Sequence, residues 1–135
     1  KPTFADFDVF GDENAEKAII TYGRTFSACA FAYEKLVNSG ESVKLIKLNR
    51  IIPVCEGAVE AAKDCRNVYF FEEGIRRGGA GEGFLFDLSK AGFSGKYHLR
   101  AIENGFVKQA SVESLLHKYG FDEEGVLSFV TSAED

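Results

Sequence analysis

Apolar segments of two kinds alternate along this chain, and their order limits the fold more than any other feature. Short β-branched or aromatic runs predict strands, and longer segments with apolar residues three and four positions apart predict helices. The expected elements, in chain order, are strand 4–10, strand 17–22, helix 24–40, strand 42–49, helix 57–65, strand 67–71, helix 82–91, strand 96–102, a short helix capped by Ser111, and helix 122–130.

This alternation is typical of a three-layer α/β/α domain, in which helices cover both faces of a mostly parallel five-stranded sheet. The first strand reaches the second through a short polar turn, GDENAE. We therefore expect those two strands to pair and the first strand to be antiparallel.

Length and composition indicate one domain, spanning residues 1–135. The chain is 45% hydrophobic and has 13 phenylalanines, enough for a substantial core. Its net charge of −5, without a clustered basic face, argues against nucleic acid or an anionic membrane as a partner. Because the sequence starts at Lys1 and has no Met, we expect it to be a fragment of a longer protein.

The stretch EEGIRRGGAGEG, residues 72–83, is a glycine-rich turn between a predicted strand and a predicted helix. Turns of this kind often bind phosphate. A P-loop requires Lys after its second Gly, but the two registers that fit place Ala80 or Phe84 there. The dinucleotide pattern also fails, because Phe84 occupies the position of its third Gly. The spacing thus favours a tight packing turn over a phosphate site.

Cysteine and histidine patterns indicate no metal centre or disulfide framework. The three cysteines include no C-x-x-C pair, so we expect reduced thiols in a cytoplasmic protein. Cys29 falls on the apolar face of a predicted helix and is expected in the core rather than as a reactive thiol. His98 and His117 are far apart in sequence and are interpreted as structural or surface residues.

The carboxyl ends of the predicted parallel strands, where such sheets bind ligands, carry little chemistry. They are Gly23–Arg24, Asn49–Arg50 and Glu72–Gly74. They supply arginines and carboxylates but no nucleophile beside a base. No catalytic set follows from these residues.

Four segments in this order resemble the C-terminal domain of transketolase-like thiamine diphosphate enzymes, most of all the 1-deoxy-D-xylulose-5-phosphate synthases. The first is a strand ending in Tyr-Gly before an Ala-rich helix, and the second is a strand running through LNRIIP. The third is EEG followed by a Gly-Gly-x-Gly turn, and the fourth is KYGFDEEG before a last helix. The resemblance covers residues 4–130.

This resemblance implies a non-catalytic, structural and dimerisation domain at the C-terminus of a longer transferase. The parent enzymes use thiamine diphosphate and Mg²⁺ and condense pyruvate with glyceraldehyde 3-phosphate. Their cofactor-binding domains precede this one, so the domain itself is expected to bind no cofactor. Its expected partners are those upstream domains and a second subunit of a cytoplasmic homodimer. No G-D-G metal-binding stretch is present in the sequence.

Within the family, the glycine-rich turn is expected to dock against another domain or subunit. Glu72 and Glu73 could form an acid–base pair, but we favour one carboxylate paired with a cation and the other solvated. Arg24 and Arg50 could bind phosphate or carboxylate equally well. The candidate interface residues are Glu72, Glu73, Arg76, Arg77, Gly78, Gly79 and Gly81.

Other functions remain open at the level of the sequence. The same scaffold occurs in split transketolases and in the β-subunits of 2-oxo acid dehydrogenases. An alternative of another class is a stand-alone α/β module that binds a phosphorylated ligand at the glycine-rich turn. An independent small enzyme is disfavoured because the sequence contains no catalytic set.

A domain cut from a larger chain should expose an apolar patch where its neighbouring domains would pack.

Overall fold

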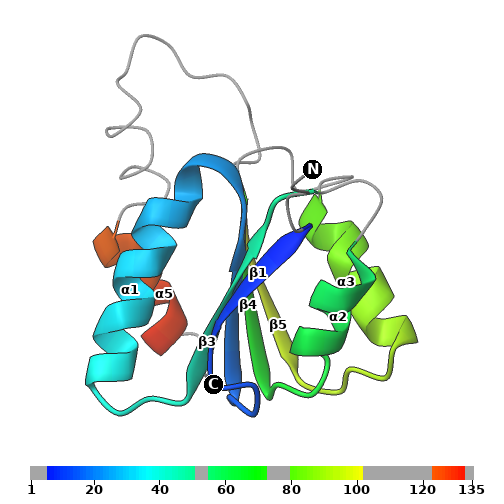
Figure 1. Cartoon of the computed structure of the whole chain (residues 1–135), viewed down its shortest axis with the longest axis horizontal. Coiled ribbons are helices and arrows are strands. Elements are labelled where there is room, and N and C mark those ends of the chain that lie inside the picture. Colours follow the sequence, from blue (N-terminus) through cyan, green and yellow to red (C-terminus); the bar gives the residue numbers. More distant parts are fainter. Residues whose placement is uncertain (1–5, 51–54, 73–79, 102–122, 133–135) are drawn as a thin grey trace, which may run out of the picture.

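A five-stranded sheet with helices on both faces forms the domain (Figure 1). The computed structural model describes residues 6–50, 55–72, 80–101 and 123–132. Its elements are β1 (Phe7–Gly11), β2 (Lys17–Thr21), a 3₁₀ turn (Gly23–Thr25), α1 (Phe26–Asn38), β3 (Val43–Leu48), α2 (Glu56–Ala62), β4 (Asn67–Glu72), α3 (Ala80–Lys90), β5 (Lys96–Ala101) and α5 (Glu123–Ser132).

The predicted elements within these ranges are found to within three residues at each end. The helix expected after Ser111 lies outside the described residues. Gly40 ends α1 as expected for a helix C-cap, with a φ of 87°. The amide of Glu41 donates to the carbonyl of Leu36 at 2.9 Å, and that of Gly40 to Val37 at 3.0 Å. These two bonds form a Schellman motif, which only a residue that tolerates left-handed backbone completes without strain.

The sheet has the strand order β1-β3-β2-β4-β5, with β1 antiparallel and the other four strands parallel. The predicted antiparallel first strand is confirmed, but its predicted partner was wrong. β1 pairs with β3, with Phe7 opposite Leu48, instead of with β2. The polar turn passes the start of β3, where the amide of Lys17 donates to the carbonyl of Ser42 at 3.1 Å. β2, which is buried along its whole length, thereby takes the central position.

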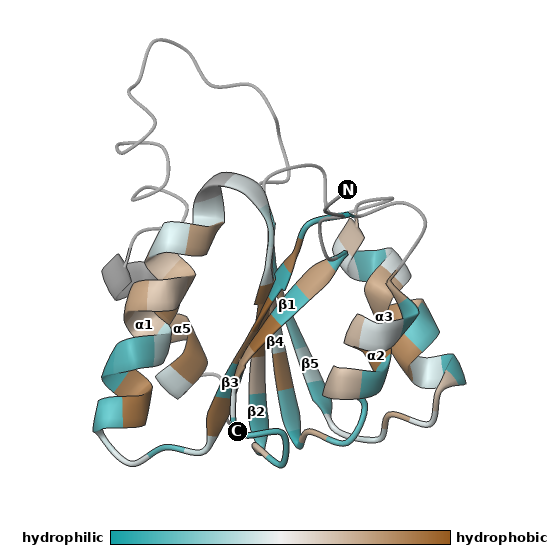
Figure 2. Ribbon diagram, in the orientation of Figure 1, coloured by the Kyte–Doolittle hydropathy of each residue, from teal (hydrophilic) through white to brown (hydrophobic). Residues whose placement is uncertain are grey.

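Among the described residues, the core consists of two hydrophobic clusters, one on each face of the sheet. Ile19, Leu45 and Phe71 pack with α1 and α5 on one face. The residues between them along the strands face α2 and α3 on the other. Because every second side chain of a strand points to the same face, the near-continuous apolar strands serve both clusters. Figure 2 shows the apolar colouring on the strands and on the sheet-facing sides of the helices.

Candidate functional site

The carboxyl ends of β2 and β4 are adjacent at the top of the sheet as drawn in Figure 1. Thr21 and Phe71 are paired there, in parallel register. From this point the chain runs into α1 on one face and into α3 on the other. Such a divergence between neighbouring strands is the position at which open α/β sheets bind ligands. It is also where the sequence placed Glu72 and the glycine-rich turn.

Glu72 ends β4 and is buried, with 1% of its surface exposed. The hydroxyl of Tyr22 donates to Glu72 Oε1 at 3.1 Å, and the amide of Gly81 donates to Oε2 at 3.1 Å. The amide of Ala80 is a further donor to this carboxylate. The carboxyl group of Glu72 therefore lies against the first turn of α3, where the amides without intrahelical partners and the helix dipole attract negative charge.

Burial is the dominant influence on this carboxyl group and raises the pKa of Glu72. The hydrogen bonds from Gly81, Tyr22 and Ala80 act in the opposite direction, and the nearby charge of Glu82 adds to the increase. The carboxylate is held by amides and a phenol inside the domain, an arrangement that the sequence did not predict. It is not the solvated member of the Glu72–Glu73 pair.

Gly81 allows α3 to approach β4 and β5 closely. A Cβ at this position would lie 2.4 Å from Leu99 Cδ1 and 2.8 Å from Glu72 Oε2. The hydroxyl of Tyr97, on β5, donates to the carbonyl of Gly81 at 2.6 Å. Gly81 lies in the first turn of a helix, so close approach, and not left-handed backbone, is the reason for glycine here.

A second hydrogen-bond network, formed by hydroxyl and thiol groups, lies at the end of β2. Gly23 follows Tyr22 with a φ of 68°, a left-handed conformation that favours glycine. Thr25 Oγ1 hydrogen-bonds the hydroxyl of Thr21 and donates to the carbonyl of Tyr22. Burial raises the pKa of the Cys29 thiol to about 12, against a smaller lowering by Thr21. The prediction of Cys29 as a core residue is confirmed, because it is fully buried in α1.

Several candidate residues lie outside the described part of the structure. Glu73, Arg76, Arg77, Gly78 and Gly79 are among them, and their interface role stays a prediction. His117 and the side chain of Arg24 also lie outside it.

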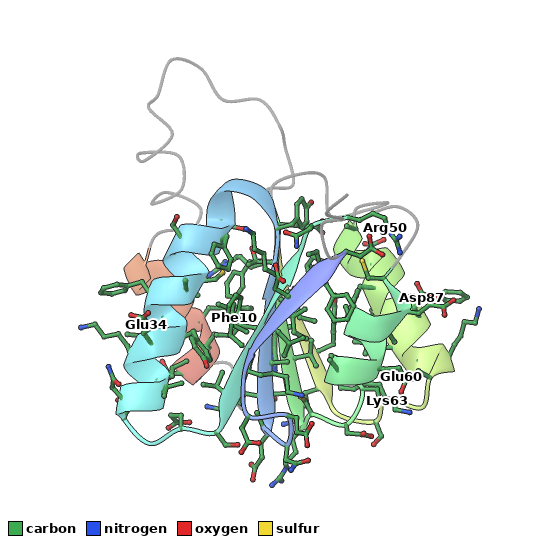
Figure 3. All side chains as sticks on the ribbon, in the orientation of Figure 1. Phe10, Glu34, Arg50, Glu60, Lys63 and Asp87 are labelled. Atoms are coloured by element: carbon green, nitrogen blue, oxygen red, sulfur yellow. The ribbon has the colours of Figure 1, made fainter. Side chains whose placement is uncertain are left out.

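Arg50 is placed by an ion pair within the domain. Its Nη1 lies 2.9 Å from Asp6 Oδ2, and both side chains are partly exposed. Figure 3 shows Arg50 at the same end of the sheet as the carboxyl ends of the parallel strands. Of the two ligands predicted for it, carboxylate or phosphate, the domain itself supplies the carboxylate.

His98 is a structural residue, as predicted. Its ring stacks on Tyr69 with centroids 4.6 Å apart, and its Nε2 lies 3.0 Å from Asn67 Oδ1. Burial, assisted by the charge of Lys96, lowers the pKa of His98, so the ring is neutral at pH 7. The neutral imidazole, stacked on Tyr69 and edge-on to Phe129, stabilises β5 against β4.

Two surface cavities lie away from Glu72 and Gly81. One, of about 470 Å³, adjoins the starts of β4 and β5 and contains Lys63 and Arg66; the other, of about 650 Å³, lies between β1 and α2 and contains Glu60. Glu60 and Lys63 lie at the opposite end of the sheet from Arg50 (Figure 3). Of the candidate residues that the structure describes, neither Glu72 nor Gly81 lines either cavity. Among the described residues no cluster of His, Cys, Asp and Glu could hold a metal ion.

Tyr22 and Tyr97 are the site residues that the sequence did not indicate. Tyr22 had a usable signal, since it directly follows a strand that neighbours the Glu72 strand in a parallel sheet. Tyr97 had none, because its contact with Gly81 depends on how α3 lies across β5.

No helix among the described residues is long and apolar enough to cross a membrane.

Comparison with known proteins identifies the family. Residues 11–126 match the family described as "Transketolase, C-terminal domain". The chain belongs to this family. A solved structure described as "Split gene transketolase, inactive beta4 tetramer" has the same fold, with a TM-score of 0.81 and 20% identity, over 96% of this chain and 43% of that chain. The expected transketolase C-terminal fold, with its antiparallel first strand, is confirmed.

Curated relatives of this transketolase C-terminal domain are 1-deoxy-D-xylulose-5-phosphate synthases. The protein of Bacteroides fragilis is 30% identical over 116 residues, which cover 84% of this chain and 18% of the relative. The protein of Shouchella clausii is 26% identical over 121 residues, covering 89% of this chain and 19% of the relative. The chain thus spans about a fifth of the length of the curated relatives it matches.

Proposed function

We propose that this chain is the non-catalytic C-terminal domain of a 1-deoxy-D-xylulose-5-phosphate synthase, a thiamine diphosphate-dependent transferase of isoprenoid precursor synthesis. The likeness to such synthases over most of the chain supports the parent enzyme. The observation that carries the non-catalytic role is the position of Glu72. Its carboxylate already fills the helix N-terminus at which a phosphate group of a ligand would bind.

Thiamine diphosphate and Mg²⁺ do not fit the described residues at the start of α3. The amides of Ala80 and Gly81, in the first turn of α3, already donate hydrogen bonds to the buried carboxyl group of Glu72, which occupies the place that a diphosphate would take. The described residues also offer no group of ligands for the metal ion. We therefore assign both cofactors to upstream domains of the parent chain.

The proposed partners are those upstream domains and a second subunit of a homodimer. The glycine-rich turn, with Glu73, Arg76, Arg77, Gly78 and Gly79, is the proposed docking segment. Glu72 and Gly81 would fix its C-terminal end through α3. We place the parent enzyme in the cytoplasm, where the three free and buried cysteines would stay reduced.

A domain exchange tests this function. The C-terminal domain of the Bacteroides fragilis synthase, which is 30% identical to this chain, would be replaced by residues 1–135. We expect the chimera to retain synthase activity and the truncated synthase without either domain to lose it. Activity in the truncated enzyme, or an inactive but folded chimera, would refute the proposal.

Titration of the isolated chain tests the cofactor assignment. Calorimetry with thiamine diphosphate and Mg²⁺ should show no saturable binding. The chimera, which contains the upstream domains, is the positive control for the same titration. Micromolar binding to the isolated chain would place the cofactor site here after all.

A further inference from the structure

The outer face of α3 exposes two large apolar side chains. Phe86 is 64% exposed and Leu85 is 36% exposed, and neither belongs to the two core clusters. On the inner face of the same helix, Phe84 and Leu88 are buried against the sheet. Among the described residues Phe86 is the most exposed large hydrophobic side chain. A phenylalanine with this exposure is the kind of residue found at protein interfaces.

On both sides of Phe86, α3 has a small residue three positions away and a charged residue four positions away. Glu82 and Gly83 precede it by four and three positions, and Ser89 and Lys90 follow it by three and four. Residues at these spacings share one face of a helix. All five are exposed. Small residues thus flank the ring on both sides, and opposite charges stand at the two ends of the face.

Two details show that this face can accept another helix. A Cβ placed on Gly83 would have no atom within 4 Å, so the backbone beside the ring is bare. The ammonium of Lys90 lies 5.2 Å from the centre of the Phe86 ring, so the positive charge is held at this face. An exposed ring beside a bare backbone combines a protrusion with a surface that another helix can approach closely.

We propose that the outer face of α3 is a contact between two copies of this chain, packed antiparallel about a two-fold axis through Phe86. Such an axis places Phe86 against Phe86 of the second copy. It also places Gly83 of each copy against Ser89 of the other, and Glu82 of each copy against Lys90 of the other. A two-fold contact requires a surface that is complementary to itself. On this face an apolar ring meets the same ring, small residues meet small residues, and opposite charges meet.

The contact gives the proposed homodimer a specific surface, and in that respect it rests on the proposed function. A single helix pair falls below the roughly 1,000 Å² expected of a stable interface, so the isolated chain should dimerise weakly. Figure 1 shows α3 on the flank of the domain, on the same face of the sheet as α2. Two copies can therefore meet through α3 without altering the sheet.

Sedimentation equilibrium of the isolated chain, over concentrations up to about 1 mM, tests the contact. Wild type should show a reversible monomer–dimer equilibrium, and Phe86→Ala should be monomeric. The matched control is Phe31→Ala, which removes a phenylalanine that is 39% exposed on α1, on the other face of the sheet. That control should dimerise as wild type does.

Charge exchange tests the antiparallel register. Glu82→Lys alone and Lys90→Glu alone each replace two attractions by two repulsions, so each should weaken association on the order of tenfold. The double variant, Glu82→Lys with Lys90→Glu, restores opposite charges and should recover wild-type association. Circular dichroism would confirm that each variant is folded.

Three results would overturn the proposal: a monomeric wild type, Phe86→Ala dimerising as strongly as wild type, or a double variant as weak as the single ones. If the outer face of α3 instead contacts an upstream domain, the isolated chain will be monomeric, which is the first of these results. None of them bears on the parent enzyme, because the activity of the chimera is measured separately.

Discussion

Replacement of Gly81 by alanine should destabilise the domain although it removes a glycine from a helix. Helix propensity alone would favour alanine by about 1 kcal/mol. Against this, the new Cβ would meet Leu99 Cδ1 at 2.4 Å, Glu72 Oε2 at 2.8 Å and Phe70 Cδ1 at 3.2 Å. The end of Leu99 can rotate away, but the carboxylate of Glu72 is held by Tyr22 and by the helix itself.

The magnitude follows from these contacts. Overpacking of a core costs roughly 1–3 kcal/mol, and disturbing a hydrogen bond to a charged group costs roughly 1.5–3 kcal/mol. After subtraction of the gain in propensity, we expect Gly81→Ala to lower the free energy of unfolding by about 2 kcal/mol or more. Urea denaturation followed by circular dichroism at micromolar protein concentration measures this difference.

Gly83→Ala is the matched control in the same helix. Its Cβ meets nothing within 4 Å, so only the propensity difference applies. We expect Gly83→Ala to raise the free energy of unfolding by about 0.5–1 kcal/mol. If Gly81→Ala is as stable as wild type, or if both variants change stability in the same direction, the close approach of α3 to Glu72 does not constrain the fold as argued.

Three further outcomes follow from the same network. Because the folded-state pKa of Glu72 is raised, its contribution to stability is fully present below the unfolded pKa of about 4.3 and is lost as pH rises through the folded pKa. As pH falls from 7 to about 4, wild type should therefore gain stability relative to Glu72→Gln, and a difference that does not change over this range in urea titrations would contradict this. Tyr97→Phe, which removes the phenol that donates to the carbonyl of Gly81, should cost about 1 kcal/mol in the same assay, and no loss would show that the 2.6 Å bond contributes nothing. Cys29, with its pKa raised to about 12, should not react with a thiol reagent at pH 8 in the folded protein, so labelling at the rate of the unfolded chain would contradict its burial.

The local elements could be predicted because their determinants are close in sequence. Residues 17–21 form a buried strand because the run is largely apolar and β-branched. Gly40 ends α1 because its own amide and that of Glu41 bond to carbonyls three and five positions back. The partner of β1 could not be predicted in this way. A short polar turn is compatible with a hairpin or with a crossing past β3, and the choice depends on the order of the whole sheet.

The candidate site was predicted in position but not in arrangement. The sequence placed Glu72 at the end of a strand and before a helix, which is correct. Its burial depends on Tyr22, which is 50 residues away, and on Gly81, which is nine residues away. The spacing of apolar residues along the sequence does not indicate contacts between such distant residues. The carboxylate was therefore expected to be solvated or paired with a cation.

The position of β1 at one edge of the sheet allows this strand to open locally. β1 is hydrogen-bonded to one strand, β3, and carries the exposed side chains of Val9 and Phe10. β2, β3 and β4 each have a neighbour on both sides. β1 can therefore detach while the parallel strands stay paired. In native-state hydrogen exchange its amides should lose protection at a lower free energy than those of β2, as a local opening and not as global unfolding.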